Sequence, residues 1–567
     1  MLLGLIIFCQ LMLYGFITYL SRWFEYSSST VDRPLLWVLA ALFACFVLHL
    51  WGLRVLLKMP ETKRTFWIVF CAALAFRGTV LPSLPIQEVD IYRYIWDGAV
   101  VRAGVSPFAY SPERVLNADT ADGYSEELRR LVDMRDQDDG LHQVLKRVHY
   151  AELTTIYPPV SQVVFAAADK ATPQNSTLRM RVLVMKIVIV AFDVGIIILI
   201  AKLMSILKMH QAWLIPYAWS PLIMKEFANS GHLDSIAVFF AVLGLYVATR
   251  VRADNGGWHS TMTAGLWLGL GVGAKLYPIV LLPVLVSSEL ARKRWMAAVS
   301  LGGMTILVSA ISLSQMIWDV RHPPADQVAS QTSLPSDLPP IPDETADNST
   351  SVNLDEPLVQ RSEDGLSTFL SRWEMNDLIF MIIEENIREN LGGEGAEDHW
   401  FVILPQSWRS QINASIISFT GMPPYRVPFV TTRALTLLLF FIVVLALSYS
   451  VWRKPGNELA VLQAAFLTVA WFWLLAPTQN PWYWSWALPL VVFARGRAWL
   501  VVGGVCLIYY LRFWLLYHYP EPGIVGSSYT GTQFFDFVLV WFEFAPLLLV
   551  LLVLWCLRPR TDSVSLR

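Results

Sequence analysis

Charged residues are scarce in this chain. Only 16% of its 567 residues are charged while 55% are hydrophobic, and the mean hydropathy is +0.48. Soluble domains carry about 25% charged residues, so the composition excludes that class and indicates a protein whose main solvent is the lipid bilayer. The formal net charge is −2, which gives no support to a nucleic-acid partner. We therefore expect an integral membrane protein without nucleic acid.

Cysteine motifs and internal repeats are also missing. The five cysteines all lie in apolar runs, so we expect small buried hydrophobes rather than disulfides; they are Cys9, Cys45, Cys71, Cys506 and Cys556. No CxxC pair and no HExxH is present, which leaves a structural zinc site or a zincin without support. The absence of an internal repeat likewise gives no support to an inverted-repeat transporter. The first run, 2–20, lacks a basic n-region and a cleavage site and is expected to be a retained helix.

Long apolar runs, by contrast, are abundant. Spanning a bilayer takes about 20 apolar residues. Twelve runs qualify or nearly do: 2–20, 35–57, 66–82, 181–204, 210–228, 232–249, 295–317, 429–452, 458–476, 482–494, 498–517 and 533–557. The Lys and Arg of the connecting loops can all lie on the cytoplasmic side only if 262–288 enters and leaves there, as two half-helices meeting near Lys275. The alternative is one ordinary span with a miscounted neighbour.

The expected fold is an all-α polytopic bundle of about 12 transmembrane helices with a re-entrant pair and two large outer loops. Its expected parts are N-terminal helices (1–82), an extracytoplasmic catalytic loop (83–180), a core with the hairpin (181–317), a second outer loop (318–428) and C-terminal helices (429–567). The first outer loop suits helices lying at the interface. In the second, the Pro/Asp/Ser-rich stretch 322–357 predicts disorder, and helical spacing through Trp373–Ile387 predicts order.

Two carboxylates follow the third predicted span, where the chain leaves the membrane. Glu88 and Asp90 open the segment 88–98, EVDIYRYIWDG. Glycosyl transfer needs a carboxylate to accept the proton of the attacking hydroxyl, and cations to stabilise a departing phosphate. Arg77, Arg93 and Arg102 are close in sequence. The alternative interpretation is that the two acids only mark the membrane–water boundary.

This chain resembles the C-type (GT-C) glycosyltransferases that use polyprenyl-phosphate sugars, in particular the mannosyltransferases of bacterial envelope glycolipids and GPI anchors. The resemblance covers about residues 66–290 and 430–520. Its motifs are EVDIYRYIWDG (88–98), GVSPF (104–108), YPP (157–159), GHLDS (231–235), AKLYP (274–278) and NPWYW (480–484). The chain departs from the family pattern in the pair of spans that precedes the first motif and in the length of the loop 318–428.

The resemblance implies an inverting transfer of one sugar, mannose being the most frequent, to an extracytoplasmic lipid or glycan acceptor. Asp90 matches the catalytic acidic position and would act as general base, with Glu88 as its neighbour or as a substitute catalytic acid. The donor would be a polyprenyl-phosphate sugar, because nucleotide sugars are absent outside the cytoplasm. The candidate donor-phosphate ligands are Arg93, Lys275, Arg77 and Arg102. The candidate substrate-binding residues are Tyr92, Asp97, Tyr157, His232, Asp234, Asn480, Trp482 and Tyr483.

Intramembrane charges require partners. Lys275 lies within an apolar stretch, where a charge costs about 2.5–3.5 kcal/mol, so we expect a partner or a polar cavity, or snorkelling to the interface. The same cost predicts that Asp193 pairs with a Lys or Arg. Asp234 could instead cap a helix, and the Trp-rich stretch 471–486 could be an aromatic belt rather than a sugar platform. The segment 373–377 fits either a carbohydrate contact or an amphipathic helix.

No cofactor is expected, because Glu88 and Asp90 alone are too few ligands for an octahedral oxygen site, and a divalent metal stays open as the alternative. The cell (inner) membrane is the expected location, with an endoplasmic-reticulum membrane as the alternative, and membrane lipids are expected partners. Three competing hypotheses remain: a transporter or flippase of lipid-linked glycans, a glycan polymerase or ligase with a late catalytic loop, and a noncatalytic scaffold.

Overall fold

The computed structural model describes residues 1–118, 124–325, 327, 374–390, 398–494 and 498–556. Within these residues the secondary structure is helical, and one isolated β-bridge joins Met375 to Thr478. Nine helical segments of the described chain are long and apolar enough to cross a membrane: Leu2–Phe24 (α1 and η1), Leu35–Leu56 (α2), Leu178–Ile206 (α9), Asp234–Ala253 (α12), Trp295–Arg321 (α15), Pro424–Trp452 (η6 and α20), Glu458–Leu475 (α21), Trp499–His518 (α23, η8 and α24) and Gly531–Leu554 (α25, η10 and part of α26, Val540–Cys556). The all-α polytopic fold is confirmed.

The other three predicted spans take different forms. The first is α3 (Lys63–Val80), a continuous helix that carries three basic residues. The run 210–228 is divided into η2 (Gln211–Leu214), α10 (Ile215–Ala218), α11 (Pro221–Ile223) and the π-helix η3 (Met224–Asn229). The run 482–494 is divided into α22 (Pro481–Trp484) and η7 (Leu488–Phe493). Prolines begin α11 and α22, and a proline lacks the N–H that would continue a preceding helix.

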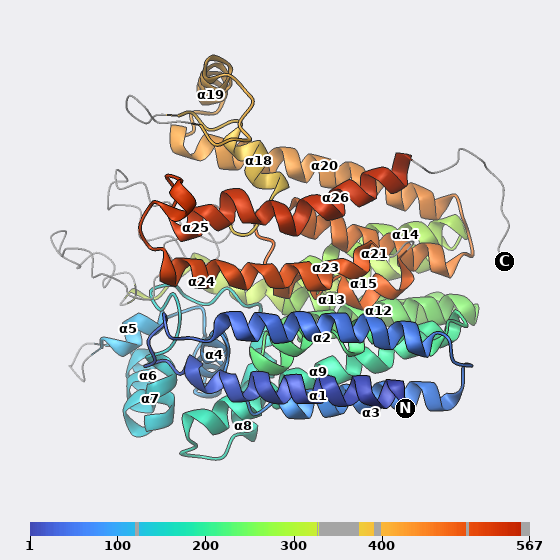
Figure 1. Ribbon diagram of the computed structural model, residues 1–567, viewed down its shortest axis with the longest axis horizontal. Coiled ribbons are helices and arrows are strands. Elements are labelled where there is room, and N and C mark those ends of the chain that lie inside the picture. Colours follow the sequence, from blue (N-terminus) through green and yellow to red (C-terminus); the bar gives the residue numbers. More distant parts are fainter. Residues whose placement is uncertain (119–123, 326, 328–373, 391–397, 495–497, 557–567) are drawn as a thin grey trace.

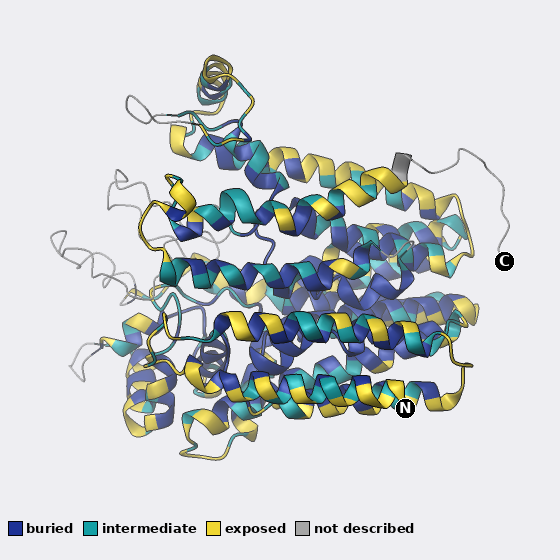
Figure 2. Cartoon of the chain, viewed as in Figure 1, coloured by how far each residue is buried: buried dark blue, intermediate teal, exposed yellow. Residues whose placement is uncertain are grey.

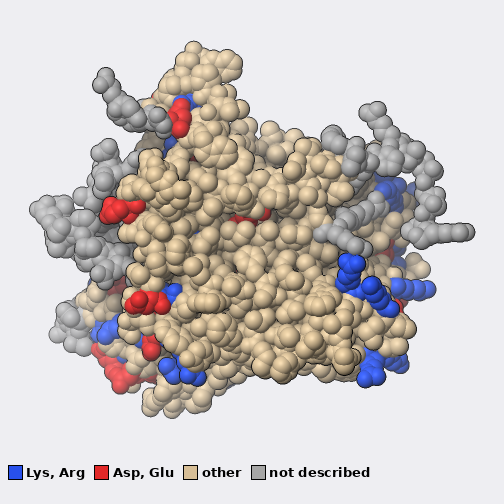
Figure 3. Space-filling model, viewed as in Figure 1, with Lys and Arg blue, Asp and Glu red and all other residues tan. Residues whose placement is uncertain are grey.

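Apolar side chains cover the sides of the bundle. Large hydrophobic residues such as Phe8 of α1, Ile311 of α15 and Phe441 of α20 are more than half exposed, and Figure 2 shows exposed positions along the lengths of α1, α20 and α26. Figure 3 shows few charges on the middle of the visible face, Lys and Arg gathered at its right end, and mixed charges at its left end. An apolar belt between two charged ends is the surface of a multi-pass membrane protein.

A helical hairpin lies inside the bundle. Helix α13 (Trp258–Ala274) ends at Lys275, whose backbone is extended, and the chain returns through η4 (Tyr277–Leu281) and α14 (Leu282–Ala291). Its two ends are joined, because Arg294 Nη2 donates to the Gly256 carbonyl at 2.5 Å and Arg292 Nη1 donates to that of Arg252 at 3.3 Å. The two half-helices predicted to meet near Lys275 are thus present.

The two loops expected on the outer side, called the first and second outer loop, form helices at one end of the bundle (Figure 1). The first contains α4 (Ile91–Arg102), α5 (Pro112–Leu116), α6 (Glu126–Gln137), α7 (Asp139–Leu145) and α8 (Pro159–Ala171). The second contains α18 (Ile379–Glu385) and α19 (Gln406–Thr420). The short η9 (Ile524–Gly526) joins α24 to α25. The stretch 322–357, for which disorder was predicted, lies almost entirely outside the described residues.

Asp193, which was expected to pair with a Lys or Arg, pairs with Arg77. Arg77 Nε and Nη2 donate to the two Asp193 carboxylate oxygens at 2.6 and 3.0 Å, and both side chains are buried. This confirms the expectation that an intramembrane carboxylate pairs with a cation. Of the cysteines, Cys45 and Cys506 are buried, whereas Cys71 is exposed on α3, so the expectation that each is a core residue was wrong for Cys71.

Candidate active site

The first outer loop is fixed to the bundle just before its two carboxylates. Asn229 accepts the Ile86 backbone N–H at 3.0 Å and donates to the Leu84 carbonyl at 2.7 Å. Lys186 Nζ donates to the Ser83 carbonyl at 2.6 Å. Because these groups are buried, the bonds form in a low dielectric and hold residues 83–86 rigidly. Glu88 and Asp90 follow at the start of α4.

Asp90 is oriented by Tyr157. The phenol of Tyr157 donates to Asp90 Oδ2 at 3.0 Å. Burial raises the pKa of Tyr157 well above its usual value, and the negative charge of Asp90 raises it further, so the phenol keeps its proton and remains a donor. Tyr157 is packed edge-on against Tyr94, which stacks on Phe165 of α8. The YPP segment therefore supplies the group that positions the acid of the first motif.

Asp234 and Lys275 form a second cluster at the tip of the hairpin. Lys275 Nζ donates to Asp234 Oδ1 at 2.6 Å, and the indole N–H of Trp486 donates to the same oxygen at 2.5 Å. Asp234 Oδ2 is buried and has no hydrogen-bond partner among the described residues. Lys275 also lies over the ring of Tyr483, 4.4 Å from its centroid. The partner that was expected for Lys275 is thus Asp234. The second carboxylate oxygen of Asp234 remains able to accept a hydrogen bond.

Tyr483 connects the two clusters. Its hydroxyl is within electrostatic range of Asp234, Asp90 and Glu88, and Tyr157 is in turn within range of Tyr483. Tyr483 and Tyr277 both stack on Trp486, at centroid distances of 4.5 and 4.4 Å. Five motifs that are far apart in the sequence therefore meet at one place, and aromatic rings line it. Paired carboxylates, one ammonium and stacked rings suit a phosphorylated sugar.

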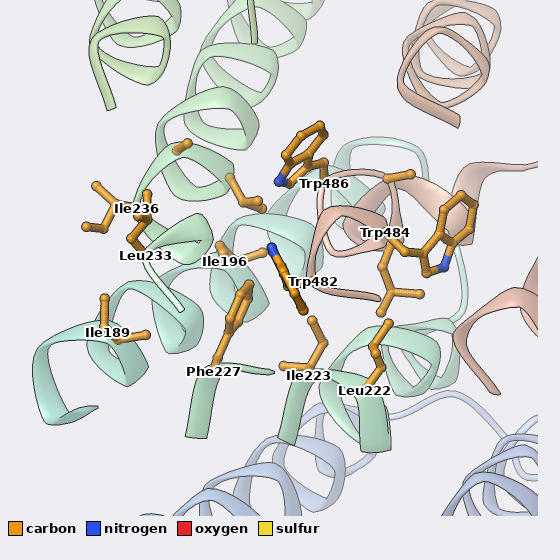
Figure 4. Close-up of a cluster of buried hydrophobic side chains, with 14 of the residues drawn as sticks. Ile189, Ile196, Leu222, Ile223, Phe227, Leu233, Ile236, Trp482, Trp484 and Trp486 are labelled. Carbon is orange, nitrogen blue, oxygen red and sulfur yellow. The ribbon is translucent and has the colours of Figure 1, made fainter. Parts of the chain in front are cut away.

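His232 and Trp482 lie beside a buried charged group. Their rings stack at 4.6 Å, and His232 Nε2 lies 3.4 Å from Glu226 Oε2. Glu226 accepts a hydrogen bond from the Tyr510 hydroxyl at 2.5 Å, and Lys225 Nζ donates to the same hydroxyl at 3.1 Å. Figure 4 shows Trp482 directed toward Ile223 and Phe227, whereas Trp484 projects to another side of the α22 turn. Packing among apolar side chains fixes Trp482 in this position.

The remaining predicted residues lie apart from this place or have structural partners. Arg93 donates to the carbonyls of Leu153, His149 and Tyr150, and so ties α4 to the segment before α8. Asp97 accepts from Gln162 at 3.1 Å, and burial raises its pKa. Arg77 binds Asp193, Arg102 binds Asp169, and Tyr92 lies near Arg147 and Glu25. Asn480 is buried, with no partner for Oδ1 within the described chain.

Sequence reasoning missed Tyr277, Trp486 and the contact of the second outer loop. Tyr277 belongs to the motif 274–278, and Trp486 lies two residues after the motif 480–484, inside the Trp-rich stretch 471–486, so attention to the motifs could have found both. The segment around Met375 could not be found this way. Met375 N–H donates to the Pro477 carbonyl at 2.9 Å, and Gln479 N–H donates to the Met375 carbonyl at 3.0 Å. These two bonds hold the backbone that leads into Asn480 and Trp482.

Residues 7–291 match the family model described as alpha-(1->6)-mannopyranosyltransferase, N-terminal domain. The match spans just over half of the chain and includes Asp90, Tyr157, Asp234 and Lys275, whereas Trp482 and Tyr483 lie beyond it. Comparisons with curated proteins and with solved structures gave no match. The resemblance inferred from short motifs is confirmed over this long segment. The chain belongs to the alpha-(1->6)-mannopyranosyltransferase family and is a glycosyltransferase of the mannosyltransferase type.

Proposed function

We propose that this protein transfers one mannose residue from a polyprenyl-phosphate donor to a lipid or glycan acceptor outside the cytoplasm, with inversion and with Asp90 as general base. The observation that carries the proposal is the position of Asp90: its carboxylate is held by Tyr157 beside the Tyr483, Asp234 and Lys275 cluster. The family supports mannose as the sugar and a 1,6 linkage in the product.

In the proposed reaction the acceptor oxygen attacks the anomeric carbon of the donor. The bond between that carbon and the phosphate oxygen breaks, Asp90 Oδ1 or Oδ2 takes the acceptor proton, and polyprenyl phosphate leaves. Lys275 has three N–H groups, of which one binds Asp234. The other two are available to the phosphate, whose negative charge grows as it departs. Asp234 Oδ2 and the ring of Tyr483 would hold the sugar.

The orientation in the membrane follows from the charges. Arg252 belongs to the last turn of α12, and Arg292 and Arg294 follow α14. In Figure 1 α12 and α14 extend to the end of the bundle opposite α4–α8, and Figure 3 shows a group of Lys and Arg at that end. Basic residues favour the cytoplasmic side. The proposed active site therefore faces away from the cytoplasm, across the cell membrane, where a lipid phosphate rather than a nucleotide must carry the sugar. Membrane lipids surround both substrates.

The test is transfer of radiolabelled mannose from polyprenyl-phosphate mannose to membrane lipids by purified protein in vesicles. Asp90→Asn is compared with the wild type and with Glu88→Gln, its neighbour in the same loop. A general base contributes about 10²–10⁴-fold, so Asp90→Asn should lose transfer by that factor while Glu88→Gln retains it. Full activity in Asp90→Asn would exclude Asp90 as the base, and no transfer from any donor by the wild type would reject the proposed donor class.

A further inference from the structure

Helix α19 (Gln406–Thr420) lies across the direction of the spans. In Figure 1 it is seen nearly end-on, whereas α20 (Val427–Trp452) runs across the picture. It stands beside the end of α20 that is nearest the outer-loop helix α18. A glycine in left-handed conformation, Gly421 with φ of 66°, ends α19, and the span Pro424–Trp452 begins three residues later. The helix is therefore placed at the level where α20 leaves the membrane.

One side of α19 is polar and faces the protein. Arg409 and Asn413 are the buried residues of this helix. Arg409 donates to Asp398 at 2.5 Å and to the Arg388 carbonyl at 2.9 Å, and Asn413 donates to the Ile387 carbonyl at 2.8 Å. These bonds attach α19 to the described part of the second outer loop through its polar groups. The apolar residues of α19 are less buried than these two polar ones, since Ile412 and Ile416 are half-buried and Trp408 and Phe419 are exposed.

A second side carries an apolar stripe. Trp408, Ile412, Ile416 and Phe419 recur at intervals of four, four and three residues, which places them on one helix face. Trp408 is 60% and Phe419 is 91% exposed. No Asp, Glu, Lys or Arg belongs to this stripe. A soluble helix buries such a face against its own protein, whereas the buried residues of α19, Arg409 and Asn413, lie on the neighbouring polar side, about a quarter turn away.

A third side is small and exposed. Ser407, Ala414 and Ser418 follow each other at intervals of seven and four residues, a little over a third of a turn from the apolar stripe, and all three are exposed. The circumference of α19 is thus divided into a protein-facing polar side, an apolar side and a small, weakly polar side. A helix lying in the plane of a membrane surface has this division, because it meets protein, acyl chains and water on different sides.

We infer that α19 lies in the plane of the membrane, at its outer surface. Its apolar stripe, from Trp408 to Phe419, is inserted among the lipid acyl chains. The occupant is lipid rather than a second copy of the chain, because α19 stands beside the outer end of a span whose own exposed residues, such as Leu437 and Phe441, are apolar. A tryptophan at this depth matches the preference of indole for the interface. The second outer loop is thereby anchored at both α20 and α19.

The test is photo-crosslinking of the full chain in phospholipid vesicles, with benzoylphenylalanine placed at Phe419 or, as the matched control, at its neighbour Ser418. Lipid adducts are quantified by mass spectrometry, and correct folding is checked by thermal unfolding. We expect severalfold more lipid adduct at 419 than at 418. The second pair, Trp408 and Ser407, gives the same comparison if a variant at 418 or 419 fails to fold. Equal lipid labelling at both faces, or cross-linked dimers at 419, would overturn the inference.

Discussion

Asp193 and Asp234 are buried carboxylates that each bind a cation, and they differ in whether both carboxylate oxygens accept hydrogen bonds. Asp193 receives two bonds from Arg77 and a third from Tyr217 at 2.8 Å, and the remaining Arg77 nitrogen donates to the Ala73 and Ala218 carbonyls. Asp234 receives Lys275 and Trp486 on one oxygen only, and its other oxygen has no partner in the described structure.

The difference distinguishes a structural pair, Arg77–Asp193, from the pair that we propose binds substrate, Lys275–Asp234. A buried ion pair with every oxygen and N–H satisfied has no capacity for a ligand, and its removal affects folding. A buried carboxylate oxygen without a partner is costly unless something binds it. In a mannosyltransferase the sugar hydroxyls can supply that bond. We therefore expect the Arg77–Asp193 pair to control stability and the Lys275–Asp234 pair to control turnover.

The largest effect should come from Asp193→Asn. The substitution leaves the Arg77 guanidinium buried without a counter-charge, and breaking a buried pair lowers the free energy of unfolding by about 3–5 kcal/mol. Denaturant unfolding in detergent micelles measures this loss. Asp234→Asn is the matched control, because Lys275 and Trp486 both bind one oxygen of Asp234 and the amide oxygen can still accept from them, whereas Arg77 binds both oxygens of Asp193 and one of these becomes an NH2 group. An equal loss of stability in the two variants would show that the two ion pairs do not differ in their contribution to folding.

Lys275→Ala should reduce turnover rather than stability. Loss of one group that stabilises a developing negative charge lowers kcat by about 10²–10³-fold. Initial rates of mannose transfer by the reconstituted variant measure the effect. Lys202→Ala removes a lysine that lies over Tyr246, away from the site, and should leave the rate unchanged. A normal rate in Lys275→Ala would assign the phosphate to another cation.

Tyr157→Phe should have a smaller effect on the rate. It removes the hydrogen bond to Asp90, and a bond to a charged group contributes about 1.5 kcal/mol, or about tenfold in rate. Tyr217→Phe removes the corresponding bond to Asp193 and sharpens the comparison, because it should lower stability with no change in kcat. If both substitutions slow transfer equally, the proposed division between the two pairs is wrong.

The smallest expected effect is a dependence of folding stability on pH, caused by a glutamate of the second outer loop. Burial raises the pKa of Glu374 well above its ordinary value of 4.5, and the neighbouring Glu384 and Asp377 raise it further, while Arg388 opposes them. The folded state therefore binds more protons than the unfolded state, so stability declines as the pH rises above 4.5. Thermal unfolding measured from about pH 5 to about pH 8 should show this decline. Glu374→Gln should flatten the profile, and a wild-type profile that rises with pH would contradict it.

Much of the fold followed from the sequence, because spanning helices and intramembrane charges obey strong rules. The nine long helices, the break at Lys275 and the pairing of Asp193 were all predicted from apolar length and charge cost. The run 210–228 was predicted as one span, yet it is divided, and Pro216 and Pro221 were the available signal. Length and hydropathy do not detect such breaks.

The candidate site was only partly predictable. Motif order identified Asp90, Asp234 and Lys275, and the structure brings them to one place. The arginines were assigned by proximity in sequence, whereas the structure gives Arg77 and Arg93 structural partners. Proximity along a helix does not fix the direction in which a long side chain points. The bonds of Met375 could not be inferred, because they join distant backbone segments that share no pattern.

The bonds of the next residue, Asn376, impose an order on biosynthesis. The Asn376 side chain donates to the Gln479 carbonyl, 103 residues later, and to Glu543 of α26, 167 residues later. A ribosome has therefore completed the segment around Asn376 long before its partners leave the tunnel. The family-matched half can insert and assemble during synthesis, but this part of the outer loop closes only when the last helix arrives. Chains that terminate early will therefore reach the membrane with their outer segment undocked.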